Sequence, residues 1–160
     1  MRRTLFLPLL VLLLTSFLWT ACDLLQENSE GQSLSFQNIE GARRLDVPES
    51  KTAVFRTETR WRGFWNRRVA TKSGVKPPPP SVDFDTQTVV GLFWGPGSGC
   101  NSMVDAIQKI TGKADGTVVV QIEDWTDGSI CTALVQPRQV IRMKKASGPV
   151  KFEGNAVPGR

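Results

Sequence analysis

Carboxylate and cysteine side chains are the groups of this chain that could do chemistry, and no histidine is present to assist them. Without imidazole there is no Ser-His-Asp or Cys-His pair, no imidazole metal site and no imidazole general base. Asp83 and Asp85 suit a turn or the outer face of a strand. Glu123, Asp124 and Asp127 lack the spacing of an EF-hand loop, so a solvated turn is preferred to a calcium site. We therefore expect no enzyme activity, no metal and no cofactor.

The first 22 residues suggest a separate role for Cys22. Two arginines precede an apolar stretch from Leu5 to Trp19, and small residues lead from there to Cys22. This pattern is typical of a bacterial secretory signal with a lipobox-like end, although Trp19 stands where an aliphatic residue is usual. A transmembrane anchor is the alternative, but the stretch of about 15 residues is shorter than the roughly 20 that a spanning helix needs. We expect a chain lipidated at Cys22 in the cell envelope, outside the cytoplasmic membrane or on the outer membrane.

Export affects what is expected of the charge and of the other two cysteines. Loss of Arg2 and Arg3 with the leader lowers the formal net charge from +5 to +3, and such weak basicity argues against nucleic acid as a ligand. An oxidising compartment favours a disulfide between Cys100 and Cys131. Two buried free thiols are the alternative, and a catalytic thiol would lack a histidine to activate it.

The clearest local element is a helix from Thr57 to about Val69. Thr57 can cap it, and Trp61, Phe64 and Trp65 recur at helical spacing, so the aromatic face should pack on a sheet. Most of the excess basic charge gathers in and after this helix, on Arg56, Arg60, Arg62, Arg67 and Arg68, followed by Lys72 and Lys76. A solvated helix face accounts for these arginines. The alternative is contact with anionic lipid headgroups or an acidic partner.

Four consecutive prolines, Pro77 to Pro80, predict a stiff extended segment after the helix. It could link two domains or bind a proline-reading module. We prefer a rigid connector inside one domain, because the residues before it are too few and too polar to bury a core alone.

Everything after the prolines has a β pattern. Val89 to Trp94 is apolar on both faces, as in a central strand. Alternating and β-branched residues predict further strands at 100–110, 117–125, 129–135, 140–143 and 150–152, with 129–135 returning antiparallel to 117–125 across a turn. We therefore expect a mainly β fold, an antiparallel β-sandwich-like sheet with one amphipathic helix packed on it and one disulfide. The expected organisation is a lipoprotein signal peptide at 1–21, a flexible tether at 22–33 and a β-rich domain at 34–156. An edge strand or extended segment is expected within 34–45.

Loops between these strands are the expected binding surface. The glycine turn at 95–99 lacks the Lys-Ser/Thr ending and the helix of a phosphate-binding loop. Tryptophan and arginine are residue types that dominate protein interfaces. The candidate partner-binding residues are Trp94, Pro96, Ser98, Trp125, Pro137 and Arg138.

Four motifs between about Val54 and Phe152 resemble the C-terminal domain of the protease complex subunit PrcB family. They are Trp61-Arg62-Gly63-Phe64-Trp65, Pro80-Ser81-Val82-Asp83-Phe84, Val89-Val90 running to Gly95, and Gln136-Pro137-Arg138-Gln139-Val140-Ile141. The resemblance implies a non-catalytic binding module, often a lipoprotein, associated with a subtilisin-like protease. It supplies no catalytic residues.

The layout also resembles chagasin-type inhibitors, which plug a protease cleft with three loops at one end of a sandwich. By that analogy the turns at 95–99, 112–116 and 137–138 would make contact. Two main hypotheses follow. The domain is an accessory, stabilising subunit of a secreted protease, or it is a structural envelope lipoprotein whose basic helix contacts membrane or wall polymer.

Overall fold

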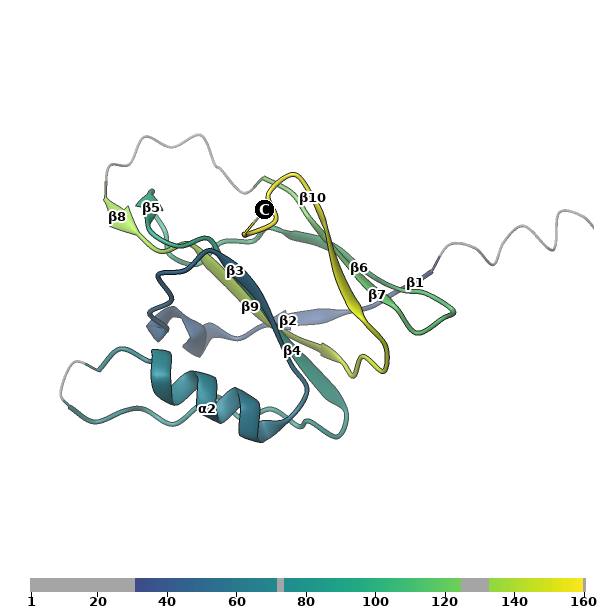
Figure 1. Cartoon of the computed structure of the whole chain (residues 1–160), viewed down its shortest axis with the longest axis horizontal. Helices are drawn as coiled ribbons and strands as arrows, with labels where there is room; N and C mark the ends of the chain where they lie inside the picture. Colours follow the sequence, from purple (N-terminus) through teal and green to yellow (C-terminus); the bar gives the residue numbers. More distant parts are fainter. Residues whose placement is uncertain (1–30, 72–73, 125–132, 160) are drawn as a thin grey trace, which may run out of the picture. The chain divides into compact units, whose positions relative to one another are not determined.

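The computed structural model describes residues 31–71, 74–124 and 133–159. The chain divides into two units, Met1–Gly31 and Gln32–Arg160, and the elements of the described residues belong to the second. The described residues form strands, one α-helix and one 3-10 helix, and Figure 1 labels the strands and helix α2. In chain order they are β1 (Gln32–Ser33), β2 (Phe36–Asn38), η1 (Glu40–Arg44), β3 (Lys51–Phe55), α2 (Glu58–Arg68), β4 (Gln87–Phe93), β5 (Gly97–Ser98), β6 (Ile107–Gly112), β7 (Val118–Ile122), β8 (Leu134–Val135), β9 (Arg138–Lys144) and β10 (Val150–Gly154).

The first four-stranded sheet has the order β2-β9-β4-β3 and is antiparallel throughout. Its interior strand β4 was predicted from the apolar run at 89–94, and the prediction is confirmed. Val89 and Phe93 pack into one core cluster while Val90 and Leu92 pack into another, so both faces of β4 are buried. The edge segment predicted within 34–45 forms β2 and then turns into the 3-10 helix η1.

The second four-stranded sheet has the order β1-β6-β7-β10. The predicted turn between β6 and β7 is present, with the Lys113 amide donating to the Thr117 carbonyl at 2.8 Å. Strand β10, however, runs parallel to β7, which corrects the expectation of a wholly antiparallel sheet. The connection from β9 reaches this sheet beside the start of β7, where the Val118 amide donates to the Pro149 carbonyl. The chain therefore enters β10 in the same direction as β7.

Two further strand predictions are corrected by the pairing. The strand expected at 100–110 begins only at Ile107, and Met103 contributes an isolated bridge to Arg138. The strand expected at 129–135 is described only over β8, which pairs with β5 and not with β7. Strand β7 has no open edge for it, because β6 and β10 lie on its two sides. Strand β3 was not predicted, because its residues show no clear apolar alternation. This fits its burial, since most of its residues are half-buried.

Two core clusters define three layers. One cluster lies between the two sheets, where apolar side chains of β4 and β9 meet those of β6 and β7. The other lies on the opposite face of the first sheet, where α2 covers it with Trp61, Phe64 and Trp65. The helix was predicted, and its start is confirmed, because the Thr57 side chain accepts a hydrogen bond from the Arg60 amide. The fold is therefore mainly β, with one α-helix in the described residues packed on a sheet.

The proline segment runs back along this helix. The indole N–H of Trp61 donates to the Pro80 carbonyl at 3.3 Å, and that of Trp65 donates to the Pro77 carbonyl at 2.8 Å. Proline carbonyls in an extended segment have no backbone partner of their own, so they are available as acceptors. The segment therefore connects elements within one compact unit, as expected.

Candidate functional site

Four consecutive residues, Gln136 to Gln139, join segments that are far apart in the sequence. The Gln136 side-chain oxygen accepts a hydrogen bond from the Val47 amide at 3.1 Å. The Pro137 carbonyl accepts one from the Trp94 amide at 3.1 Å. This segment therefore fastens the end of β4 and the chain after η1 to the start of β9.

Gln139 closes a second junction inside the domain. Its side chain is 1% exposed, and its oxygen accepts from the amides of Ala106 and Ile107 at 2.8 and 2.9 Å. Its nitrogen donates to the Asn38 side-chain oxygen at 3.1 Å. Because an unpaired buried amide is costly, one glutamine here secures the start of β6 against the other sheet.

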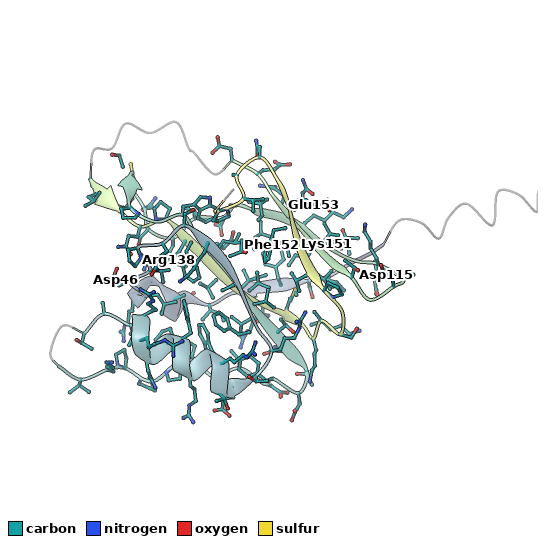
Figure 2. All side chains as sticks on the ribbon, in the orientation of Figure 1. Asp46, Asp115, Arg138, Lys151, Phe152 and Glu153 are labelled. Carbon is teal, nitrogen blue, oxygen red and sulfur yellow. The ribbon has the colours of Figure 1, made fainter. Side chains whose placement is uncertain are left out.

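Arg138 is a buried cation that points toward the chain between η1 and β3. It is 6% exposed. Its Nε donates to the Gln136 carbonyl at 2.9 Å, and its Nη1 donates to the carbonyls of Arg43 and Leu45. Burial lowers the pKa of Arg138, whereas the negative charge of Asp46 raises it. Figure 2 labels Arg138 and Asp46 close together, yet in the described residues no carboxylate lies within ion-pair distance of the guanidinium.

A cleft of about 930 Å³ opens directly above this arginine. One wall is the end of η1 with the residues after it, another is the start of the proline segment, and Arg138 contributes to the lining. Its lining residues are Arg43, Arg44, Leu45, Asp46, Ala70, Val75, Lys76, Pro77, Pro78, Ser102, Gln136 and Arg138. Basic and apolar groups therefore dominate the cleft.

The backbone sets the walls of this cleft. Leu45 and Val69 form an antiparallel bridge, so the chain after η1 lies beside the end of α2. The Ala70 amide donates to the Arg44 carbonyl at 2.7 Å, and the Asp46 amide donates to the Arg68 carbonyl at 2.6 Å. The side chains of Arg43 and Arg44 are thus exposed on a firmly held segment.

The five predicted partner-binding residues that the structure describes do not form one surface. Trp94 is half-buried against the inter-sheet core, and its indole donates to the Ala156 carbonyl at 2.7 Å. Pro137 and Arg138 are buried, whereas Pro96 and Ser98 are exposed. Trp125 lies outside the described residues, as do Cys22 and Cys131. Only Arg138 of the described candidates lines the cleft.

The three turns suggested by the inhibitor analogy do not gather at one end. Pro137 leads into the start of β9, and the chain after Gly95 lies at that same end of the sheet. The turn at 112–116 lies beside Gly148, which follows the other end of β9. Figure 2 shows Asp115 of this turn well away from Arg138. A three-loop contact surface is therefore absent from the described structure.

The sequence signals for this cleft were missed. Arg43 and Arg44 were not singled out, although two adjacent arginines precede Leu45 and Val47, which alternate with Asp46. Val75 and Lys76 come just before the prolines, and Val75 is 75% exposed. The available local signal was Val75, an apolar residue beside the stiff prolines. The residues of the opposite wall of the cleft lie about thirty positions earlier in the sequence.

The acidic groups form no metal centre in the described ranges. The Asp83 carboxylate accepts hydrogen bonds from the Asp85 amide at 3.0 Å and from the Thr86 hydroxyl at 2.8 Å. These bonds lower the pKa of Asp83, the hydroxyl having the larger effect. The pair therefore lies in a turn, which is one of the two arrangements that its spacing suggested.

No protein-family model, no curated protein and no solved structure matches this chain. In the described residues, no helix is both long and apolar enough to cross a bilayer.

Proposed function

We propose that this chain is a lipid-anchored envelope protein whose β-rich domain is a non-catalytic binding module, an accessory and stabilising subunit of a secreted subtilisin-like protease. The observation that carries the proposal is the cleft above Arg138, which combines this buried, hydrogen-bonded arginine with exposed basic and apolar side chains in its lining. A concave site with convergent polar groups on a rigid scaffold is the usual form of a binding site. The family resemblance supplies the class of partner.

The anchor part of the proposal rests on the leader-like first 22 residues. Lipidation of Cys22 predicts incorporation of labelled fatty acid in bacterial cells and recovery of the protein with membranes. Cys22→Ser should abolish the labelling and release the protein into a soluble fraction. Equal labelling of both forms would contradict an anchor at this residue.

The disulfide between Cys100 and Cys131 belongs to the same proposal. Strands β5 and β8 are paired, and the Gly99 amide donates to the Ala133 carbonyl at 3.0 Å, so the described chain next to the two cysteines runs side by side. A bridge closing that loop would stabilise the domain by roughly 3 to 4 kcal/mol in the chain-entropy model. Non-reducing peptide mapping of protein from the envelope should recover the linked pair. Recovery of two free thiols would refute the disulfide.

Affinity capture tests the partner. The full chain in non-ionic detergent is the bait in an envelope extract from the source organism, and a peptidase should be enriched. The cleft variant Arg44→Gln/Lys76→Gln should lose that enrichment. The control variant Arg62→Gln/Arg67→Gln removes the same charge from the outward face of α2 and should retain it. If both variants capture the peptidase equally, the contact lies elsewhere. If no peptidase is enriched, the proposal is contradicted.

A second function, contact with membrane or wall polymer, is favoured by the arginines of α2. Arg60 and Arg67 line a shallow groove of about 410 Å³ beside β3, and both are exposed. Arg68 is not part of this face, because it forms an ion pair with Glu49 at 2.5 Å. Binding of the unlipidated protein to anionic vesicles at low salt, and its loss in Arg60→Gln/Arg67→Gln, would support this function. No vesicle binding at low salt would reject it.

A further inference from the structure

We infer that the cleft above Arg138 binds a short acidic peptide segment of the partner, holding its carboxylates with the cationic groups of the cleft. The inference rests on the proposed function as a protein-binding module and specifies which chemistry the site recognises.

The charge of the lining is the first argument. Arg43, Arg44 and Lys76 are exposed around the cleft, and Asp46 is the one acidic side chain in its lining. Neither arginine forms an ion pair within the described residues. Lys76 donates to the Asn66 carbonyl at 2.6 Å, which is a neutral partner. The exposed cations therefore favour an anionic ligand.

The floor of the cleft is the second argument. Arg138 is a buried cation, and its hydrogen bonds go to neutral carbonyls through Nε and Nη1. Within the described residues Nη2 donates no hydrogen bond, and the residue lines the cleft. A carboxylate beside Nη2 would form a charge-assisted hydrogen bond and offset part of the cost of burying the cation.

The shape and apolar parts of the lining point to a peptide and not to a lipid surface. A flat bilayer cannot reach the floor of a concave site, whereas a peptide side chain can. Val75, Pro77 and Pro78 offer apolar surface next to the cations, and Val75 is exposed without such a ligand. Adjacent apolar and acidic side chains of a peptide match this arrangement.

Fluorescence anisotropy of a labelled peptide tests the inference. The probe is Gly-Leu-Asp-Val-Glu-Leu-Gly, and the comparison peptide replaces its two acids by the corresponding amides. Both are titrated with the full chain in non-ionic detergent. We expect the acidic peptide to bind at least tenfold more tightly than the amide peptide and to weaken as salt is raised. Equal affinity for the two peptides would overturn the inference.

Matched variants locate the binding. Arg44→Gln/Lys76→Gln should weaken binding of the acidic peptide about tenfold, since each exposed charge contact contributes modestly. Arg62→Gln/Arg67→Gln has the same net charge as the cleft variant, and its affinity for the acidic peptide should stay within twofold of that of the unchanged protein. An equal loss in both variants would show non-specific charge attraction and refute a site in the cleft. The site would also be refuted if the acidic peptide fails to bind and the protein binds anionic vesicles that the peptide does not displace.

This test and the capture experiment can fail separately. Enrichment of a peptidase through the cleft, together with equal affinity for both peptides, would refute acidic recognition and leave the proposed function standing. Specific binding of the acidic peptide without enrichment of a peptidase would support the inference about ligand chemistry and contradict the assigned partner.

Discussion

At the scale of single residues, the Gln-Pro-Arg-Gln segment shows how an apparent contact loop can be a structural junction. Pro137 and Arg138 were predicted to face a partner because loops often carry binding surfaces and arginine is a common interface residue. The polar atoms of this segment instead bind backbone groups near positions 45, 94 and 106. Those partners are separated from it by tens of residues. Local sequence pattern carries no information about them.

Gln139→Leu should destabilise the domain by about 3 kcal/mol, because it leaves the buried amides of Ala106 and Ile107 without an acceptor. Urea unfolding followed by tryptophan fluorescence measures this. Gln108→Leu is the control, since Gln108 is exposed on the neighbouring strand β6. Equal unfolding midpoints for the two variants would contradict the role of Gln139.

At the scale of elements, helix α2 was predictable and the partner of strand β10 was not. The Thr57 cap and the aromatic spacing lie within a few residues of each other, so the helix boundaries follow from local chemistry. The direction of β10 depends on where the connection after β9 crosses to the other sheet. That choice is made by packing of the whole chain.

Trp65→Phe should destabilise the domain more than Trp61→Phe. Both tryptophans are 1% exposed, and both substitutions replace an indole by a phenyl ring. Trp65→Phe removes a 2.8 Å hydrogen bond to Pro77, whereas Trp61→Phe removes a longer one of 3.3 Å to Pro80. We expect a cost of about 2 kcal/mol for Trp65→Phe. Thermal and urea unfolding of the two variants gives the order. The reverse order would show that ring packing, not the bond to the prolines, governs stability here.

At the scale of the whole molecule, the cleft is assembled from the end of η1, the chain just after α2, the proline segment and the start of β9. The mainly β class and the covering helix could be predicted, because alternation and amphipathic spacing report burial directly. The cleft could not be predicted, because its floor and walls are brought together only by long-range pairing. A sequence pattern identifies buried faces more readily than the hollows between them.

The stability of the domain should fall in acid and stay level near neutrality. Hydrogen bonds to the ionised forms lower the pKa of Glu49, through Arg68 first, of Asp83, through Thr86 first, and of Asp115, through the Thr117 amide first. A carboxyl whose pKa is lower in the folded state contributes stability above its unfolded value and loses it as the pH falls through the folded value. Stability should therefore decline below about pH 4.5, the ordinary value for Glu49.

Urea midpoints measured from pH 3 to pH 7.5 test this expectation. Between pH 5.5 and 7.5 the midpoint should be constant, because the chain has no histidine to titrate there. Asp83→Asn should show a smaller decline in acid than the unchanged protein. A drop between pH 7.5 and 5.5 would contradict the assignment of the pH dependence to these carboxylates.

The pairing of early strands with late ones also bears on how the chain folds during export. Strand β2 finds its partner in β9, with Phe36 opposite Met143, and β7 is completed by β10 at the end of the chain. Such distant pairing gives slow folding, because large loops must close before their contacts form. If the chain is threaded outward from its N-terminus as proposed, neither sheet can be completed until the last strands emerge. The strand order itself would then keep the polypeptide unfolded and transport-competent until it reaches the compartment where it works.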